Sequence, residues 1–507
     1  MRNVLEYLEE STLKHPDKNV ALDDKESCTY RELTEAAKGI GTLLAGKTYA
    51  GMPVAVFMDK SVTCLKVFMG ILYGGCFYSL IDPSFPDERI ASILGTLQND
   101  IVITRKEHEQ KLRGAGYQGE IVFVENLDGL SYDEEILANI RQNATDMDGV
   151  YCNFTSGSTG VPKGVLVCHR SIIDFIDNFT DIFNITENDV IGNQAPFDFD
   201  VSVKDIYSTI KVGATIVIIP KSYFMFPNQV VDMLDQNNVT TLIWAVSALC
   251  LLNRMHGLKY KVPSKINKIL FSGEMMPIKQ LNGWRSYYPD ALFVNLYGPT
   301  EITCNCTYYI LDREFAEDEM LPMGNAFPNE RVFLLDDENR EITSDMPNTS
   351  GEICVAGTCL ALGYYNNEEM TAKAFIRNPL ERRFPETIYR TGDLAYWNED
   401  GLLFFAGRKD FQIKHMGHRI ELEEIESVLG SVSCVSHGCC FFDEEKSKVV
   451  ACYVGNGDKR QIVEEMRKRV PDYMVPNVFI PMEELPITKN GKTDRALLKE
   501  QYKSRRK

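Results

Sequence analysis

Residues 151–165 read Tyr151-Cys152-Asn153-Phe154-Thr155-Ser156-Gly157-Ser158-Thr159-Gly160-Val161-Pro162-Lys163-Gly164-Val165. After a strand-like start, four hydroxyl residues, three glycines and one lysine fall within ten positions. Glycines let the backbone approach an anion, amides and hydroxyls donate hydrogen bonds to it, and the lysine adds a positive charge. The stretch therefore predicts a phosphate-binding loop, with a flexible Ser/Gly linker as the alternative.

On either side of this loop, short apolar runs alternate with helix-period stretches. The apolar runs, which we expect to form buried strands, cover residues 54–58, 101–104, 215–219, 241–244, 269–271 and 292–294. Helical patterns such as 228–237 lie between them. This alternation is typical of a layered α/β fold. From about 330 to 407 the pattern changes to short strands joined by turns, which predicts a β-rich subdomain.

The last hundred residues have the pattern of a separate α+β unit. Two strands, over 434–442 and 448–453, flank a charged turn, and a helix over 459–469 follows. We therefore predict a large N-terminal domain over 1–407, a hinge over 408–410 and a small mobile C-terminal domain over 411–507.

The chain is acidic, with 54 Lys and Arg against 72 Asp and Glu and a formal charge of −18. This balance argues against nucleic acid or an anionic membrane as the main partner. No signal peptide is predicted at the N-terminus, and the apolar stretch 54–81 is interrupted by charges, so no membrane insertion is expected. The 14 cysteines have neither metal-site nor disulfide spacing, which predicts reduced thiols in a cytoplasmic protein.

A second phosphate-loop pattern is misleading. Residues 41–48, from Gly41 to Thr48, match the letters of the Walker A motif. That motif needs a strand before it and a helix after it. Here a helix over 30–44 comes first, Gly46 is its expected C-cap, and a strand over 54–58 follows. We therefore expect no nucleotide at this position.

Five further motifs follow the loop at 151–165 in order. They are Asn295-Leu296-Tyr297-Gly298-Pro299-Thr300-Glu301, Gly351-Glu352-Ile353 with Gly363-Tyr364-Tyr365, Tyr389-Arg390-Thr391-Gly392-Asp393, Gly407-Arg408-Lys409-Asp410 and Asn490-Gly491-Lys492-Thr493-Asp494-Arg495. Together they resemble the ordered motifs of the acyl-adenylate-forming superfamily over nearly the whole chain. The resemblance implies a ligase that uses ATP and Mg²⁺ to join a carboxylate to AMP with release of pyrophosphate, and then to a thiol.

The resemblance assigns most of these residues to ATP. The phosphates would be held by Thr155, Ser156, Gly157, Ser158, Thr159 and Lys163. The adenine and ribose would be held by Asn295, Tyr297, Gly298, Asp393 and Arg408. Thr300 would touch the α-phosphate, and Glu301 would supply a hard oxygen ligand to Mg²⁺, which suits that ion.

Lys492 is the expected catalytic cation. A mobile positive charge can bridge the substrate carboxylate and the charge that develops on the phosphoryl oxygens. The same lysine would have to leave before a carrier thiol reached the carbonyl. The resemblance implies that residues 411–507 rotate about Asp410, which would allow both steps. It also implies a phosphopantetheinylated carrier protein as the partner that supplies the thiol.

The acid to be activated is expected to be an amino acid. Two Phe-Asp pairs compete, ending at Asp198 and Asp200, and the residues that follow select Asp200. In amino-acid-activating relatives this carboxylate binds the substrate ammonium, a charge-assisted contact. The resemblance also places in this pocket Val201, Lys204, Ser272, Cys304 and Lys492.

Among such enzymes, the chain resembles the D-alanine–D-alanyl carrier protein ligases of lipoteichoic acid biosynthesis, which favours D-alanine or another small amino acid. Ser272 and Lys204 stand where those enzymes have Cys and Met, and Ala245-Val246-Ser247 replaces Thr-Pro-Ser. Two alternatives are a nonribosomal-peptide-type adenylation enzyme for a different amino acid and an inactive nucleotide-binding relative. Three readings of the role of Lys204 are open. It could form an ion pair with Asp200, or it could contact an acidic substrate side chain. The favoured reading is a snorkelling lysine at the pocket rim, with its stem packed and its ammonium in water.

Overall fold

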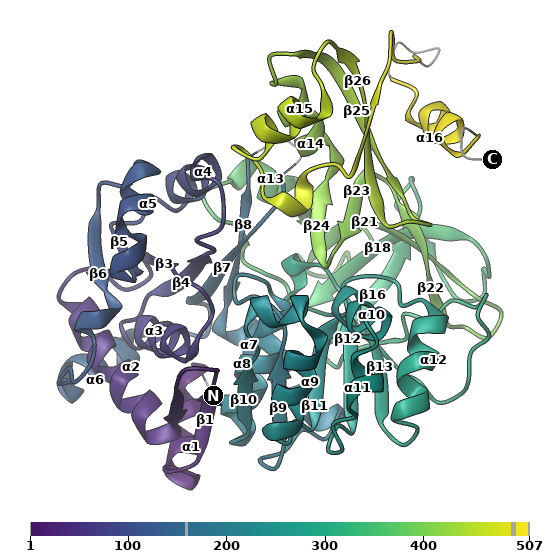
Figure 1. Ribbon diagram of the computed structural model, residues 1–507. Helices are drawn as coiled ribbons and strands as arrows, with labels where there is room; N and C mark the ends of the chain where they lie inside the picture. Colours follow the sequence, from purple (N-terminus) through teal and green to yellow (C-terminus); the bar gives the residue numbers. More distant parts are fainter. Residues whose placement is uncertain (1, 158–160, 488–492, 505–507) are drawn as a thin grey trace.

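The computed structural model describes residues 2–157, 161–487 and 493–504 (Figure 1). One seven-stranded sheet carries the phosphate loop, and its inner parallel strands are buried apolar runs, as expected for strands covered on both faces. Its strands in sheet order are β19 (Gly363–Tyr364), β8 (Lys163–Cys168), β7 (Gly149–Thr155), β4 (Phe77–Ile81), β3 (Pro53–Phe57), β5 (Ile101–Thr104) and β6 (Glu120–Phe123). The associated helices are α2 (Tyr30–Ala45), α3 (Val62–Tyr73), α4 (Asp87–Leu97), α5 (Glu109–Gly114) and α6 (Glu134–Asn143), with η1 (Lys106–His108) and η2 (Val124–Asn126).

A nine-stranded sheet forms the second layer of the N-terminal domain. Its strands in sheet order are β15 (Asn325–Ala326), β14 (Thr307–Ile310), β13 (Leu292–Tyr297), β12 (Lys268–Ser272), β11 (Thr241–Ala245), β9 (Val190–Asn193), β10 (Thr215–Ile218), β1 (Asn19–Leu22) and β2 (Ser27–Thr29). Its helices are α1 (Leu5–Lys14), α7 (His169–Ile182), α8 (Val201–Val212), α9 (Pro227–Gln236), α10 (Val246–Arg254), α11 (Gly257–Tyr260) and α12 (Ile278–Tyr287), with η3 (Lys221–Met225) and η4 (Thr300–Ile302).

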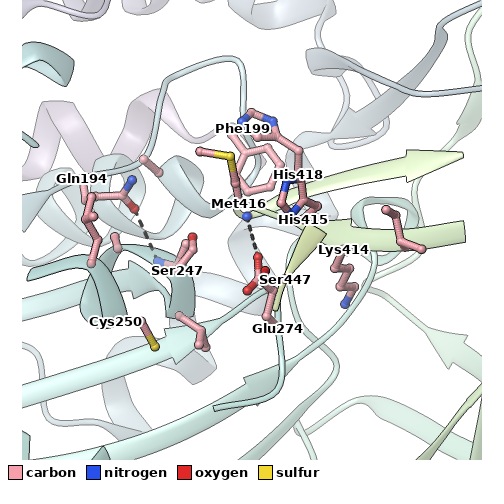
Figure 2. A pocket seen from close by; sticks show the side chains of 18 of the residues that line it. Gln194, Phe199, Ser247, Cys250, Glu274, Lys414, His415, Met416, His418 and Ser447 are labelled. Atoms are coloured by element: carbon pink, nitrogen blue, oxygen red, sulfur yellow. Dashed lines mark hydrogen bonds between the residues drawn. The ribbon is translucent and has the colours of Figure 1, made fainter. Parts of the chain in front are cut away.

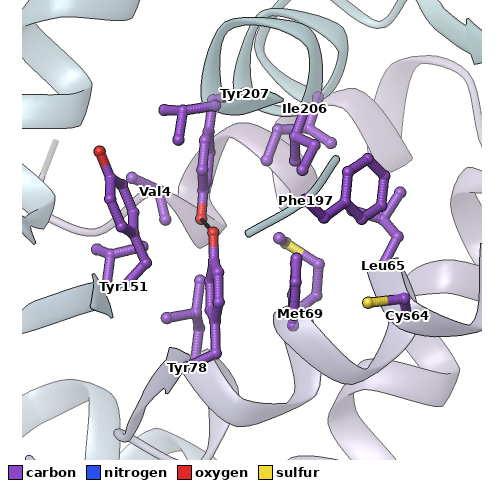
Figure 3. Close-up of a cluster of buried hydrophobic side chains, with 14 of the residues drawn as sticks. Val4, Cys64, Leu65, Met69, Tyr78, Tyr151, Phe197, Ile206 and Tyr207 are labelled. Atoms are coloured by element: carbon purple, nitrogen blue, oxygen red, sulfur yellow. Dashed lines mark hydrogen bonds between the residues drawn. The ribbon is translucent and has the colours of Figure 1, made fainter. Parts of the chain in front are cut away.

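The two sheets share one apolar core, and helix α8 runs through it. The Tyr78 hydroxyl on β4 is 3.0 Å from the Tyr207 hydroxyl on α8, and Tyr151 of β7 lies beside them (Figure 3). The Phe68 ring of α3 stacks on Tyr78 with ring centroids 3.9 Å apart. This packing fixes α8 against both sheets, so that its first turn lies near the end of the phosphate-loop strand.

The β-rich subdomain and the C-terminal domain follow, as the sequence predicts. The subdomain contains β17 (Glu341–Ile342), β16 (Glu330–Leu335), β18 (Ser350–Gly357), β21 (Thr387–Trp397), β20 (Phe375–Arg377), β22 (Leu403–Arg408) and α13 (Glu368–Ala374). The C-terminal domain contains β23 (Gln412–His415), β24 (His418–Glu421), α14 (Leu422–Gly430), β25 (Val435–Asp443), β26 (Lys448–Gly455), α15 (Lys459–Met466), η5 (Asp472–Met474), β27 (Val478–Pro481) and α16 (Arg495–Ser504). It has its own apolar cluster, which supports the α/β fold with a large and a small domain.

The Walker-like stretch lies at the end of α2, as predicted, and Gly41 has a packing role there. A Cβ added to Gly41 would lie 2.6 Å from Tyr73 Cβ, because α2 and α3 pack closely at this point. Thr29 caps the start of α2 with Glu32 in a capping box. Among the described residues, no helix is both long and apolar enough to cross a bilayer.

Candidate active site

The phosphate loop connects β7 to β8, and Thr155 pairs with Lys163 across the two strands. The Lys163 ammonium is buried, 3.9 Å from Glu301 Oε1 and 5.2 Å from the centre of the Tyr364 ring. The buried Thr155 hydroxyl has no hydrogen-bond partner among the described residues. An unsatisfied buried donor beside a cation fits an anion. Ser158 and Thr159, the other predicted phosphate ligands, lie outside the described residues.

Glu301 lies in η4, fully buried, directly beside the phosphate loop. Arg419 Nη1 of the C-terminal domain donates to Oε2 at 2.5 Å, and the Tyr364 hydroxyl donates to Oε1 at 2.7 Å. Burial alone would raise the pKa of Glu301, but Arg419 and Lys163 outweigh it and lower that pKa to about 2. The carboxylate is therefore ionised at neutral pH, as a ligand to Mg²⁺ must be.

A single carboxylate suits Mg²⁺, which is usually held by one or two carboxylates together with substrate phosphates. The described residues contain no group of three or more His, Cys, Asp or Glu side chains able to hold a metal by themselves. Glu301 therefore fits the expected role, provided that Arg419 moves away from its oxygens.

The predicted adenine and ribose residues lie together on β13, β21 and β22 and in the turn after β13. The Tyr297 hydroxyl donates to Asp393 Oδ2 at 2.6 Å, and the Arg408 guanidinium donates to Oδ1 of the same carboxylate. The Asn295 amide donates to the Pro322 carbonyl at 2.9 Å. Gly298 has no room for a side chain, since a Cβ would lie 2.5 Å from the Cα of residue 305.

The residues predicted to form the amino-acid pocket also lie close together. Asp200 and Val201 begin α8, and the Cys304 thiol donates to the Asp200 carbonyl at 3.0 Å. Burial raises the pKa of Asp200, while a hydrogen bond with Thr300 and the charge of Lys204 lower it. The structure thus brings residues 200–204 and 300–304, which are far apart in the sequence, to one buried site.

Lys204 does not snorkel, so the favoured reading of this residue is wrong. Its side chain is fully buried on α8, and Nζ donates to Asn305 Oδ1 at 2.6 Å and to Ser272 Oγ at 3.3 Å. Burial lowers its pKa, and Cys304, Asp200 and Asp205 act against this at longer range. Lys204 forms no ion pair with Asp200, so the ion-pair reading is not supported either. Residues 201–210 of this helix are all buried in the shared core.

Sequence reasoning did not single out Asn305. It follows Thr303 and Cys304, which have φ values of 54° and 76°. Left-handed backbone at non-glycine residues is costly and is concentrated at functional sites. Neither backbone strain nor a contact to Lys204 is visible from residue types alone.

The hairpin β23–β24 and the start of α14 cover the phosphate loop, which was also not foreseen. Ser156 Oγ donates to the Arg419 carbonyl at 2.8 Å and accepts from the Glu421 amide at 3.1 Å. The Gly157 amide donates to Glu424 Oε2 at 3.1 Å, and Glu424 is paired with buried Arg89 at 3.0 Å. A carboxylate of the C-terminal domain therefore takes an amide that a phosphate oxygen would use.

A cavity of about 2410 Å³ lies between the two domains (Figure 2). Phe199 and Glu274 line it from the N-terminal domain, and Met416 and His418 line it from the hairpin. The Gly417 amide donates to Glu274 Oε1 at 2.6 Å, at a turn where φ is 82°. Asp198, the alternative to Asp200, lines this cavity, whereas Asp200 does not.

Asp410 is held to Arg408 by two hydrogen bonds, and its Oδ1 also accepts from the Gln412 amide at 3.2 Å. It stands between the last strand of the subdomain and the first strand of the C-terminal domain. Lys492 lies outside the described residues.

Comparison with known proteins agrees with the motifs. The family model "AMP-binding enzyme" matches residues 8–365, and "AMP-binding enzyme C-terminal domain" matches 424–492. Bacitracin synthase 1 of Bacillus licheniformis is 33% identical over 98% of this chain, and zwittermicin A synthase ZmaJ of Bacillus cereus is 30% identical over 98%. The chain covers 9% of the first protein and 94% of the second.

Solved structures show the same fold. The Vibrio cholerae adenylation domain AlmE, in complex with glycyl-adenosine-5'-phosphate, has a TM-score of 0.85 at 21% identity and covers 99% of this chain and 98% of that one. Holo-PA1221, with adenylation and carrier domains, has a TM-score of 0.84 at 23% identity over 98% of this chain and 84% of that one. The matched domains, the ordered motifs and the shared fold show that this chain belongs to the AMP-binding enzyme family.

Proposed function

We propose that this protein activates an amino acid as aminoacyl-AMP and transfers the aminoacyl group to the phosphopantetheine thiol of a carrier protein. The observation that carries the proposal is the convergence of buried Asp200 with the phosphate-side residues Thr300 and Glu301. A buried carboxylate beside a polyphosphate site is suited to an ammonium group. The structures of AlmE, solved with a glycyl adenylate, and of holo-PA1221, which contains a carrier domain, support the two steps.

In the first step, a substrate carboxylate oxygen bonds to the α-phosphorus of ATP, and pyrophosphate leaves with the electrons of the broken P–O bond. Asp200 holds the substrate ammonium, and Lys163 neutralises phosphate charge. Bound Mg²⁺ would supply further charge neutralisation at Glu301. We assign the mobile catalytic cation to Lys492 from the motif.

In the second step, the carrier thiolate bonds to the acyl carbon, and AMP leaves from the tetrahedral centre. The arrangement of the hairpin suits this step, because Arg419 and Glu424 cover the positions that metal and phosphate would take. The cavity between the domains offers a route for a long thiol arm to the site. We propose rotation about Asp410 as the change between the two arrangements.

This proposal allows two classes of amino-acid substrate. Resemblance to the D-alanine ligases favours D-alanine or another small amino acid, and the match to peptide synthetases such as bacitracin synthase 1 favours a broader choice. The burial of Lys204 supports the broader choice, since it changes the charge of the pocket. We propose the cytoplasm as the compartment, because all 14 cysteines are free thiols.

The test is ATP–pyrophosphate exchange with a panel of amino acids, followed by transfer of radiolabelled substrate to a phosphopantetheinylated carrier. Exchange with at least one amino acid supports the proposal. Nucleotide binding without exchange for any amino acid in the panel would favour the inactive relative instead.

A further inference from the structure

Lys204 is a buried cation whose local partners are neutral. Its Nζ donates to the Asn305 amide oxygen at 2.6 Å and to the Ser272 hydroxyl at 3.3 Å, and its side chain is fully buried. An ammonium has three N–H donors, and the described residues accept from two of them. Burial of an ammonium without a matching anion costs several kcal/mol. The cradle therefore holds the lysine in place without neutralising it.

Neither of the two carboxylates that act on the charge of Lys204, Asp200 and Asp205, accepts a hydrogen bond from it. Asp205, on the same helix, accepts from the Asn193 amide at 2.6 Å and also lies within the electrostatic range of Lys60. Asp200 stands one helical turn before Lys204 and is the group assigned to the substrate ammonium. When that ammonium binds, the negative charge of Asp200 is shared between two cations. A negatively charged group on the substrate would restore the charge balance around Lys204.

A purely space-filling role explains this residue less well. An uncharged side chain of similar length would close the pocket around a small substrate without the cost of a buried charge. The two hydrogen bonds also fix Nζ at a defined point, which suits recognition of a group more than filling of space.

We propose that Lys204, held by Asn305 and Ser272, binds an anionic group on the substrate side chain, so that the amino acid activated belongs to the aspartate and glutamate class. This inference rests on the proposed function and narrows its substrate. Asp200 then binds the α-ammonium and Lys204 binds the side-chain carboxylate. The two charges lie on one face of α8, which gives the substrate a fixed orientation.

The experiment is ATP–pyrophosphate exchange on the full chain with isosteric pairs: aspartate against asparagine and glutamate against glutamine, both enantiomers, with D-alanine, L-alanine, glycine and serine in parallel. We expect one acid to have a kcat/KM about 100-fold above its amide, since a buried charge pair loses about that much when one partner becomes neutral. Lys204→Met should remove most of this preference. Lys211→Met, at the far end of the same helix, is the matched control and should keep it.

The comparison of acid with amide on the wild type needs no variant, so a folding defect in Lys204→Met does not obscure the answer. Efficient exchange with alanine, glycine or serine and none with the acids would overturn the inference while leaving the proposed function intact. Equal use of acid and amide would overturn it as well. Exchange with no amino acid at all would overturn the proposed function and this inference together.

Discussion

The guanidinium of Arg419 lies 2.5 Å from the carboxylate of Glu301, across the interface between the two domains. Glu301 is the residue that the sequence assigns to Mg²⁺, and Arg419 belongs to the hairpin that covers the phosphate loop. One carboxylate oxygen cannot serve both cations in the same geometry. The proposed binding of Mg²⁺ at Glu301 would therefore compete with this position of the hairpin, which relates the two proposed half-reactions.

The Arg419 contact predicts an unequal effect on the two steps. Arg419→Met should slow transfer from preformed adenylate to the carrier by about 10-fold, because the covering arrangement loses a buried charge pair. Exchange should change less, since Arg419 has to leave Glu301 before ATP and metal bind. Single-turnover transfer and steady-state exchange measure the two effects. Arg467→Met, which removes an exposed pair with Asp472, is the control, and a greater loss of exchange than of transfer would contradict the model of competition.

Substitution of Lys492 should slow adenylate formation more than transfer, the opposite of the effect expected for Arg419. Lys492→Ala should reduce adenylate formation by about 100-fold or more, because charge stabilisation in the transition state is lost. Transfer from preformed adenylate should suffer much less. Lys468→Ala, which removes an exposed lysine of the same domain, should affect neither step. Equal losses in both half-reactions of Lys492→Ala would argue against alternation of the domains.

Substitutions of the two neighbouring aspartates, Asp198 and Asp200, should have different effects on the kinetics. Asp200→Asn should raise the KM for the amino acid strongly and leave ATP binding nearly unchanged, because the lost partner is the substrate ammonium. Asp198→Asn should not raise that KM, since Asp198 faces the cavity between the domains. Exchange kinetics with each substrate varied in turn distinguish the two. If Asp198→Asn has the larger effect on amino-acid KM, the register chosen from the sequence is wrong.

His169 predicts a dependence of stability on pH. Its Nδ1 accepts from the Val4 amide at 3.2 Å, and burial lowers its pKa to about 4. A lowered histidine pKa means that the unfolded chain binds the proton more readily, so stability falls as the pH drops from about 6.5 towards 4. From pH 7 to pH 5 the loss from this residue should be about 2 kcal/mol. Urea unfolding of wild type and His169→Gln at both values measures it, and an identical pH dependence in the two proteins would contradict the assignment.

Most of the fold could be predicted because it depends on local pattern. The strand expected at 101–104 is β5 to the residue, and the helix expected at 228–237 is α9 shifted by one position. Apolar runs of strand length and helical periodicity are properties of neighbouring residues. The helix expected at 459–469 ends earlier, at Met466. The sequence alone does not distinguish the last turn of a helix from the turn that follows it.

The family and the order of the motifs could be predicted from the sequence alone, because each motif is a short contiguous stretch with its own backbone demands. Two contacts became visible only in the folded chain: Lys204 is buried against Ser272 and Asn305, which lie 68 and 101 positions away, and Arg419 reaches Glu301 over 118 positions. Such contacts depend on how whole layers and domains pack. The burial and charge of a side chain therefore follow from its distant neighbours, and no local pattern contains them.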